Sequence, residues 1–350
     1  MNILIVKTSA IGDVIHTLPA LHCLRRQYPE ARITWLVEEA AAAVVVGHPA
    51  LDRVLVVGRK GWIREWRAGE RLAAGRQAWH FLRELRDTRY DLLLDFQGLL
   101  KSGIWVALAR ARRKVGFGRG MDHAEMSYLF LNERVPAVSM EMHAVDRELH
   151  LLRAIGIECP EVRFELPLTA ADHAAARDLL TAHGLGPDTP FVAINPLTTW
   201  PTKHWQATKF AQLADRLLAA GMVVVFTGGP GDAPGVTAIE GQMRTKAVNL
   251  AGRTSLKSLA ALYAKARVVV STDTGPMHVA AAVGTPVVAL FGPTAPWRTG
   301  PYGEGHRIIR LGLPCSPCLK KQCQYGTTAC MTDIPVDEVA QAVGNLFGEA

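Results

Sequence analysis

Short runs of valine, isoleucine and leucine recur along the chain, separated by segments long enough for a helix. The runs are continuously apolar rather than alternating with polar residues, which is typical of parallel strands buried on both faces. We expect strands at residues 2–7, 32–37, 53–57, 92–95 and 114–117, and again at 191–195, 223–227, 247–250, 268–271 and 287–291. The pattern predicts an α/β fold in which helices cover parallel sheets.

The alternation of strand and helix occurs twice. We expect helices at residues 14–28, 70–86 and 99–109, then at 205–220, 256–264, 277–283 and 336–347. Between the halves, residues 157–172 lose this periodicity and carry Pro160 and Pro167. A length of 350 residues also favours two domains. We predict Rossmann-like domains at residues 1–165 and 166–335, their sheets facing a central cleft, and a C-terminal helix at 336–350. Ligands of such sheets bind beyond the carboxyl ends of the strands.

Basic residues are concentrated in the first half. Residues 59–89 hold nine Lys or Arg against four acids, with Trp62, Trp66 and Trp79 among them. This region is either a solvated helix face or a surface for an anionic partner: nucleic acid, a phosphorylated glycolipid or an anionic membrane. No apolar run reaches the ~18 residues of a spanning helix, and the first residues read as a strand rather than a signal peptide. We expect a cytoplasmic protein.

Three loops of the second half end strands of one predicted sheet. The turn Asp273-Thr274-Gly275 opens a helix, whose free backbone N–H groups and dipole favour an anion, although Asp273 or Thr274 could instead only cap that helix. Together the loops predict a nucleotide-diphosphate pocket, with Lys203 at the pyrophosphate. The candidate residues of this pocket, for which the resemblance described below implies a donor-binding role, are Thr198, Thr199, Gly228, Gly229, Asp232, Thr254, Asp273, Thr274, Gly275 and His278. Neither the P-loop nor the dinucleotide fingerprint occurs.

The first loop, "TSAIGDVIHTLPAL", differs from a phosphate cradle. It has one glycine, Gly12, and beside it a carboxylate, Asp13, which a phosphate would disfavour. Asp13 is therefore either the N-cap of the following helix or a general base.

With "IVKTSAIGDVIHTLPAL", "TTWPTKHW" and "STDTGPMHVAAAVGTPVVALFGPT", the chain resembles the bacterial heptosyltransferases of lipopolysaccharide inner-core assembly, glycosyltransferase family 9 with the GT-B fold. The similarity runs from end to end, and the first loop resembles the first heptosyltransferase type. The resemblance implies inverting transfer of L-glycero-D-manno-heptose from ADP-heptose onto a Kdo-lipid A acceptor. It implies Asp13 as catalytic base and Lys203 at the donor phosphates. No D-x-D pair ends a strand, so we expect metal-independent transfer with no required cofactor.

In this interpretation the first domain binds the acceptor. The candidate acceptor-binding residues are Lys7, Thr8, Ser9, Gln97, Lys101, Arg59, Lys60 and Arg64. We expect a monomer in peripheral contact with the cytoplasmic face of the inner membrane, and no nucleic-acid partner. Open alternatives are a GT-B transferase using another heptose acceptor or nucleotide sugar, a nucleotide-sugar epimerase, and a nucleic-acid binder with a cysteine-bound metal.

Two of the six cysteines, Cys23 and Cys159, are expected to be isolated thiols. The others form a C-x₂-C-x₄-C-x₆-C cluster in residues 315–330: Cys315, Cys318, Cys323 and Cys330. In a cytosolic chain, close cysteines indicate metal or redox chemistry. The residues alone do not decide between two alternatives. The four cysteines either form a structural metal site, for zinc or an iron–sulfur cluster, or are reduced thiols or local disulfides.

Overall fold

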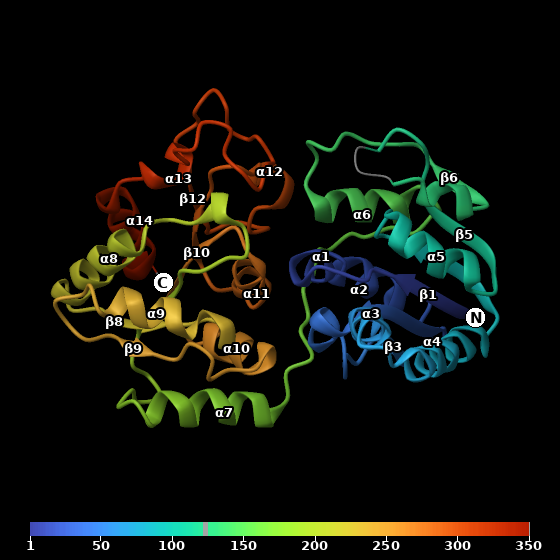
Figure 1. Ribbon diagram of the computed structural model, residues 1–350, viewed down its shortest axis with the longest axis horizontal. Coiled ribbons are helices and arrows are strands. Elements are labelled where there is room, and N and C mark those ends of the chain that lie inside the picture. The colour runs from blue at the N-terminus through green and yellow to red at the C-terminus, as the bar shows by residue number, and fades with distance from the viewer. Residues whose placement is uncertain (122–124, 350) are drawn as a thin grey trace. The chain divides into compact units, whose positions relative to one another are not determined.

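The computed structural model describes residues 1–121 and 125–349. The chain divides into two compact units, Met1–Pro167 (unit 1) and Leu168–Ala350 (unit 2); the sequence prediction places this boundary between residues 165 and 166. Within the described residues, each unit contains one six-stranded sheet with helices against it (Figure 1). Every strand pair is parallel, so the predicted fold class is confirmed.

In unit 1 the strands are β1 (Asn2–Val6), β2 (Arg32–Glu38), β3 (Arg53–Val57), β4 (Tyr90–Asp95), β5 (Ala111–Phe117) and β6 (Glu133–Val135). Their order in the sheet is β3-β2-β1-β4-β5-β6. The order reverses between β1 and β4, which makes the carboxyl ends of these two strands the expected binding position of a doubly wound sheet. The first loop, with Asp13, follows β1.

The helices of unit 1 are α1 (Ile11–His16), α2 (Leu18–Gln27), α3 (Arg59–Arg67), α4 (Arg71–Arg86), α5 (Leu100–Leu108) and α6 (Ala144–Arg153), with 3₁₀ turns η1 (Glu39–Val44) and η2 (Ser127–Phe130). The prediction of one helix over residues 14–28 is wrong, because the chain forms α1 and α2 with a break at Thr17. Pro19 has no N–H to continue the first helix, and it is tolerated in the first turn of the second. Helix α3, rich in arginine and tryptophan, was not predicted.

In unit 2 the strands are β7 (Phe191–Asn195), β8 (Val223–Phe226), β9 (Val248–Asn249), β10 (Val268–Thr272), β11 (Val287–Leu290) and β12 (Arg307–Ile309), in the order β12-β11-β10-β7-β8-β9. The helices are α7 (Ala170–Thr181), α8 (Ala207–Ala219), α9 (Ala233–Glu240), α10 (Leu256–Tyr263), α11 (Gly275–Ala282), α12 (Pro296–Thr299), α13 (Ala329–Thr332) and α14 (Val336–Glu349), with η3 (Pro201–Lys203) and η4 (Pro230–Asp232). The strand order reverses between β10 and β7. In the described ranges, no helix has the length and apolar character needed to cross a membrane.

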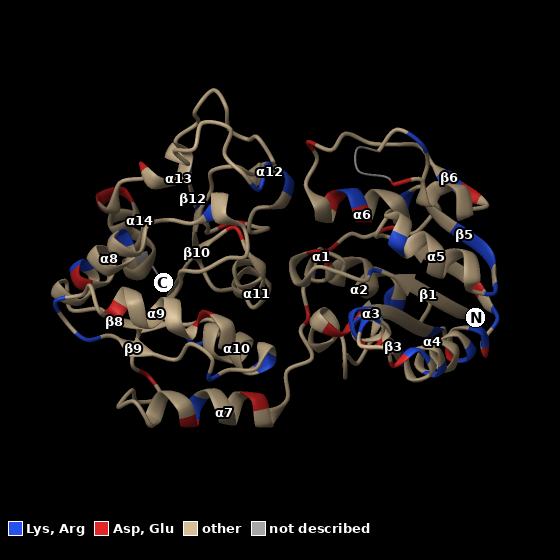
Figure 2. Ribbon diagram, in the orientation of Figure 1, with Lys and Arg blue, Asp and Glu red and all other residues tan. Residues whose placement is uncertain are grey.

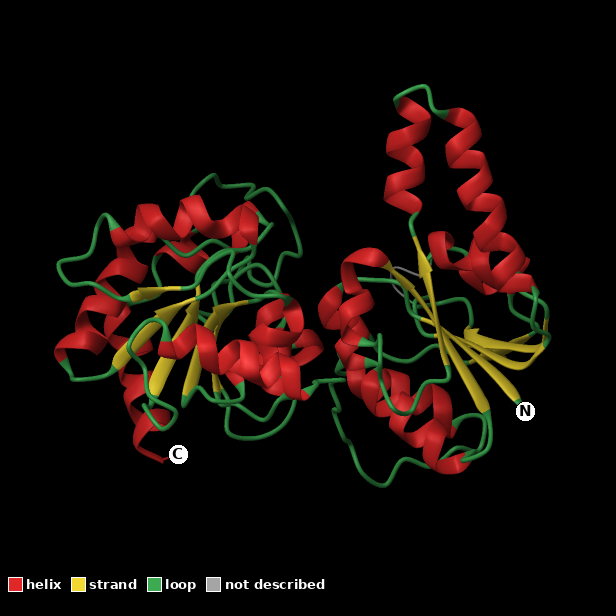
Figure 3. Cartoon of the chain, turned by 90° about the horizontal axis from the view of Figure 1, so that it is seen from below, coloured by secondary structure: helices red, strands yellow, loops and turns green. Residues whose placement is uncertain are grey.

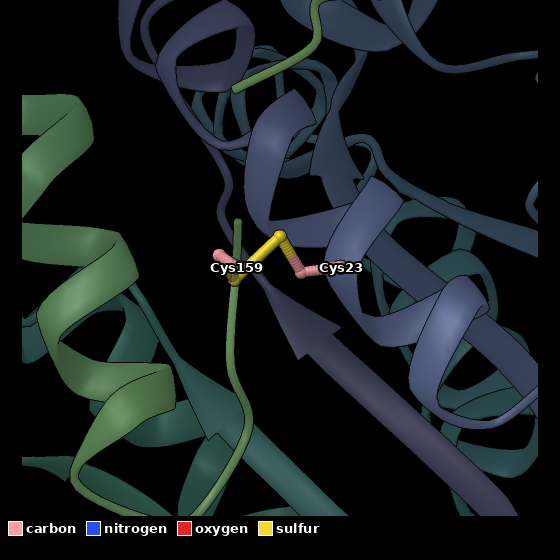
Figure 4. Close-up of a disulfide and its surroundings, with 2 residues drawn as sticks. All are labelled: Cys23 and Cys159. Carbon is pink, nitrogen blue, oxygen red and sulfur yellow. A yellow bond between two sulfur atoms is a disulfide. The ribbon is translucent and has the colours of Figure 1, made fainter. Parts of the chain in front are cut away.

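Cys23 and Cys159 form a disulfide, so the prediction of isolated thiols is wrong. Cys23 lies on α2 and Cys159 follows α6, with 5.4 Å between their Cα atoms (Figure 4). Helices α2 and α6 pack against each other, which brings together two residues 136 positions apart in the sequence. Sequence spacing carries no information about such a contact.

The disulfide predicts a thiol count. Protein purified without reductant and denatured in guanidinium should present four titratable thiols, and six after reduction. Closing a loop of this length stabilises a chain by on the order of 4–5 kcal/mol in the chain-entropy model, so the Cys23→Ser/Cys159→Ser variant should unfold at lower denaturant concentration. Six thiols before reduction would contradict the pairing.

Candidate active site

The predicted donor-binding residues of unit 2 follow four strands that are neighbours in the sheet. Thr198, Thr199 and Lys203 follow β7, the pair Gly228-Gly229 follows β8, Thr254 follows β9, and Asp273, Thr274 and Gly275 follow β10. Because the carboxyl ends of parallel strands meet at one edge of a sheet, these loops lie along the same edge.

Lys203 and Asp273 join two of these loops directly. The Lys203 Nζ atom donates to Asp273 Oδ2 at 2.6 Å and to the Asp273 carbonyl oxygen at 3.2 Å. Both side chains are largely buried, with 14% and 8% of their surface exposed. The same ammonium lies 4.5 Å from the centre of the Trp200 ring. The loop after β7 is thus locked to the loop after β10, and a fixed positive charge lies beside the start of α11.

The start of α11 has the features of an anion site. Thr274 occupies the N-cap position with an extended backbone, and within the described residues its side chain makes no capping hydrogen bond. Asp273, the other predicted cap, has a carboxylate oxygen paired with Lys203. His278, one turn into the helix, is buried. Side-chain capping of this end, the alternative left open by the sequence, is therefore not observed for Thr274.

Asp232 has a local role in the loop after β8. Its Oδ2 atom accepts a hydrogen bond from the Gly229 N–H at 2.8 Å, which closes the 3₁₀ turn η4. A Cβ atom at position 228 would lie 2.8 Å from the Asp232 Cβ, so this turn requires glycine there. The presence of glycine at position 228 and of aspartate at position 232 is therefore explained by the geometry of this loop.

A buried polar network that the sequence analysis missed supports this edge. The Tyr263 and Thr227 hydroxyls are 2.8 Å apart, and the Asn195 amide donates to the Thr227 carbonyl oxygen at 3.3 Å. Burial raises the pKa of the Tyr263 hydroxyl, which keeps it neutral. The network connects the ends of β7 and β8 beneath the loops. The sequence signal was Asn195, an amide at the end of an apolar strand.

Unit 1 has its own cavity, of about 280 Å³, at the carboxyl ends of β1, β4 and β5. It brings together three of the predicted residues, Lys7, Asp13 and Gln97. Its lining also includes three residues that sequence reasoning missed: Asp95, Arg147 and Glu148.

Lys7 forms a buried ion pair in this cavity. Its Nζ atom donates to Glu148 Oε1 at 2.6 Å and to the Phe96 carbonyl oxygen at 3.0 Å. Burial raises the pKa of Glu148, and the Lys7 ammonium opposes that shift. A lysine directly after a buried strand needs an acidic partner, and this could have directed attention to Glu148 on the apolar face of α6.

Asp13 occupies the third position of α1. Its Oδ2 atom accepts a hydrogen bond from the Ala10 N–H at 2.9 Å. The N-cap of α1 is Ala10, so the N-cap role considered for Asp13 from the sequence is wrong; Asp13 instead accepts the Ala10 N–H from inside the first turn. This hydrogen bond fixes the carboxylate at the cavity wall, and so does not exclude a catalytic role.

The remaining predicted acceptor-binding residues form a network. Gln97 Oε1 accepts hydrogen bonds from the backbone N–H groups of Thr8 and Ser9 at 2.8 and 3.0 Å. Lys101 donates to the Ser9 hydroxyl and lies 3.6 Å from Glu38, whose same oxygen lies 3.7 Å from Arg59. Glu38 was missed by the sequence analysis. The last two predicted residues, Lys60 and Arg64, have exposed side chains on α3, away from the described lining of the cavity.

Asp95 ends β4 and is fully buried. Its Oδ1 atom accepts hydrogen bonds from the N–H groups of Gln97 and Gly98, both at 3.1 Å. Burial nevertheless raises the pKa of Asp95 to about 6, and these bonds and Lys7 only partly oppose the shift.

This shift predicts a pH-dependent stability. Between about pH 4 and pH 6 folded Asp95 keeps a proton that the unfolded chain has released, so stability falls as pH rises and levels off above pH 6. Asp95→Asn removes this dependence and keeps the Oδ1 acceptor. From pH 4 to pH 7, the unfolding free energy of the variant should rise relative to wild type by on the order of 3 kcal/mol. Urea unfolding at several pH values measures the difference; parallel curves would contradict the assignment.

The four clustered cysteines of unit 2, Cys315, Cys318, Cys323 and Cys330, are free thiols that line one small cavity of about 20 Å³. Backbone N–H groups, foremost that of Thr328, hold the pKa of the Cys323 thiol below its usual value, whereas burial raises the pKa of Cys330. In the part of the chain that the structure describes, no three or more metal-ligating side chains are arranged to hold an ion. The predicted structural metal site thus has no support, and none of the four cysteines forms a disulfide.

Each unit contains a doubly wound parallel sheet. The loops of unit 2 have the features of an anion site, and the first loop of unit 1 carries an acidic residue. This is the architecture of a GT-B glycosyltransferase. The family model described as "Glycosyltransferase family 9 (heptosyltransferase)" matches residues 78–329. The chain belongs to this family, and the resemblance stated from the sequence is confirmed.

Individual relatives agree with this assignment. The chain is 36% identical to lipopolysaccharide heptosyltransferase 1 of Pseudomonas aeruginosa, over 94% of this chain and 89% of that protein. The structure of Escherichia coli heptosyltransferase WaaC with ADP is similar with a TM-score of 0.76 at 26% identity, covering 99% of this chain and 100% of the other. E. coli ADP-heptose LPS heptosyltransferase II shares the fold, with a TM-score of 0.77 at 22% identity, covering 100% of this chain and 99% of the other.

Proposed function

We propose that this protein transfers L-glycero-D-manno-heptose from ADP-heptose onto a Kdo-lipid A acceptor in the assembly of the lipopolysaccharide inner core. The observation that carries the proposal is 36% identity to a lipopolysaccharide heptosyltransferase 1 over 94% of the chain. The related WaaC structures, one with ADP and one with ADP-2-deoxy-2-fluoro heptose, support an adenine-diphosphate heptose as donor. Unit 1 is the acceptor-binding domain and unit 2 the donor-binding domain.

The reaction inverts the anomeric centre. Asp13 takes the proton of the acceptor hydroxyl while that oxygen attacks the anomeric carbon, and the bond from that carbon to the ADP oxygen breaks on the opposite face. The proposal is supported by the position of Asp13 on the wall of the unit 1 cavity, where the Ala10 N–H fixes one carboxylate oxygen. The network through Gln97 then holds the first loop around the acceptor.

The donor side supplies positive charge for the departing ADP. Lys203 and the N-terminus of α11 form a preorganised anion site, the kind of arrangement that usually contributes most to catalysis. Transfer is metal-independent in this mechanism, because these groups take the part of a metal and the sequence has no D-x-D pair at a strand end. The enzyme acts as a monomer in peripheral contact with the cytoplasmic face of the inner membrane.

Replacing Asp13 with asparagine should separate binding from chemistry. Asp13→Asn can still accept the Ala10 N–H but cannot take a proton, so kcat should fall by about 10²- to 10⁴-fold while affinity for ADP-heptose stays within about twofold. Calorimetric titration and an ADP-release assay measure the two quantities. The matched control Glu30→Gln, at an exposed site of unit 1, should behave as wild type. A wild-type kcat in Asp13→Asn would rule out this base.

Lys203→Met should weaken donor binding and slow transfer together. The substitution removes the ammonium and leaves the largely buried Asp273 carboxylate facing the diphosphate. We expect at least a tenfold loss in ADP affinity together with a lower kcat, because a hydrogen bond to a charged group contributes roughly 1.5–3 kcal/mol and the remaining carboxylate repels the diphosphate. Lys246→Met, on the exposed surface of unit 2, is the control. Unchanged ADP affinity and rate in Lys203→Met would remove this lysine from the mechanism.

The proposal as a whole is tested by nucleotide and acceptor choice. The protein should bind ADP in preference to UDP and GDP, and should release ADP from ADP-heptose only when Kdo-lipid A is present. A preference for an acceptor that already carries heptose would indicate the second type of enzyme. ADP release or sugar conversion without acceptor would indicate hydrolysis or an epimerase, and a preference for UDP would refute the heptose assignment.

A further inference from the structure

Helices α3 and α4 form an antiparallel hairpin that extends beyond the sheet of unit 1 (Figure 3). Its base is held by a cluster of three aromatic rings, Trp62, Phe81 and Trp105, whose centroids are 5.1–6.3 Å apart. Beyond that base the hairpin buries little, and α3 has no buried residue at all. Most surface helices bury an apolar stripe, so a hairpin with so little burial calls for an explanation.

Large apolar side chains on this hairpin are exposed to solvent. The exposed fractions are 84% for Leu72, 63% for Trp79 and 55% for Trp66. On α4 the spacing of Leu72, Gly75 and Trp79 places them on one helix face. Gly75 lines a groove of about 290 Å³ between the two helices, with Trp66 on the α3 side. Trp66 therefore lines an apolar groove whose α4 side consists of small residues. Leu72 and Trp79 lie on the same face of α4 as Gly75, outside the lining of that groove.

The same hairpin is strongly basic. Residues 59–76 contain six Lys or Arg and two acids, and Lys and Arg positions, blue in Figure 2, recur along α3 and α4. The Arg71 guanidinium lies 5.4 Å from the centre of the Trp66 ring, and Arg59 and Arg67 line the groove. Arginine stems can cover apolar surface while their charged ends stay in water. Apolar and cationic groups are thus interleaved on one surface.

We propose that this hairpin docks the enzyme on an anionic lipid bilayer, with Trp66, Leu72 and Trp79 inserted among the headgroups and the arginines at the lipid phosphates. Tryptophan and arginine are the residues that favour this interface, and neither apolar burial nor charge alone explains the combination. The inference rests on the proposed function, because an acceptor anchored by lipid A lies in such a bilayer.

A second copy of the chain and a nucleic acid fit the surface less well. A symmetric dimer through this face would bring the six basic residues of each copy together with only two acids per copy to offset them. A nucleic acid would match the charge but would gain little from Leu72, which has 84% of its surface exposed. A bilayer matches both kinds of group.

The test is co-sedimentation of the full-length protein with vesicles of phosphatidylcholine containing 30% phosphatidylglycerol, and with phosphatidylcholine alone. We expect wild type to bind the anionic vesicles at least tenfold more tightly. The variant Trp66→Ser/Leu72→Ser/Trp79→Ser should lose at least tenfold in this binding, and Arg67→Gln/Arg71→Gln/Arg76→Gln should lose both affinity and salt dependence. The matched control Ile104→Ser/Leu129→Ser/Ile308→Ser removes three other exposed apolar side chains and should bind as wild type.

Two further measurements keep the outcomes distinct. Each variant is checked by thermal unfolding, and its heptose transfer is measured with detergent-solubilised acceptor, where the hairpin variants should match wild type. Vesicle binding by the Trp66/Leu72/Trp79 variant equal to that of wild type would overturn the docking proposal. The proposal would also be overturned if wild type formed a dimer or bound DNA and only the Trp66/Leu72/Trp79 variant lost that property. Vesicle binding without heptose transfer by wild type would instead refute the proposed function and leave the docking surface intact.

Discussion

A buried lysine paired with a carboxylate fixes the key loop of each unit. In unit 1, Lys7 directly follows the central strand β1 and reaches Glu148 on α6. In unit 2, Lys203 is in the loop after the central strand β7 and reaches Asp273 after β10. Each pair joins elements far apart in the sequence at the point where the strand order reverses. The first loop begins directly after the Lys7 contact, and the loops after β7 and β10 are joined by the Lys203 contact.

Such pairs are an expensive way to build a stable protein. Desolvating two charges offsets most of their attraction, and an apolar replacement is often equally stable. Removing one partner destabilises the protein far more, because the other charge is then buried without a counterion. The pairs are therefore better explained by what they hold in place than by the stability they add. Asp95, whose pKa burial raises to about 6, adds a further unfavourable charge to the same cavity. Three of the ionisable groups that line this cavity, Lys7, Asp95 and Glu148, are buried. Such a cluster indicates a site, because a purely structural core would avoid it.

Most of the fold, and the outline of the site, could be predicted from the sequence. Continuous apolar runs identified the central strands, and turn residues after those strands identified the loops with Asp13, Lys203 and Asp273. Contacts between distant segments could not be predicted. The Cys23–Cys159 disulfide and the Lys7–Glu148 pair depend on where α6 packs, which no local pattern specifies. The break between α1 and α2 was readable in principle, since Pro19 lies inside the predicted helix. The short strands β6 and β12 carry too few apolar residues to be recognised.

The Lys203–Asp273 pair also bears on how a diphosphate leaving group would be stabilised. An ammonium already fixed by Asp273 and the Trp200 ring needs no reorganisation when negative charge develops on the departing nucleotide. The same carboxylate weakens the attraction for a diphosphate that is merely bound. A paired lysine therefore gives up some donor affinity. In the proposed mechanism the gain is preorganisation, because the ammonium is already in position when the charge on the leaving oxygen increases. An unpaired lysine in the same loop would attract the diphosphate more strongly, but its flexible side chain would have to be ordered as that charge develops.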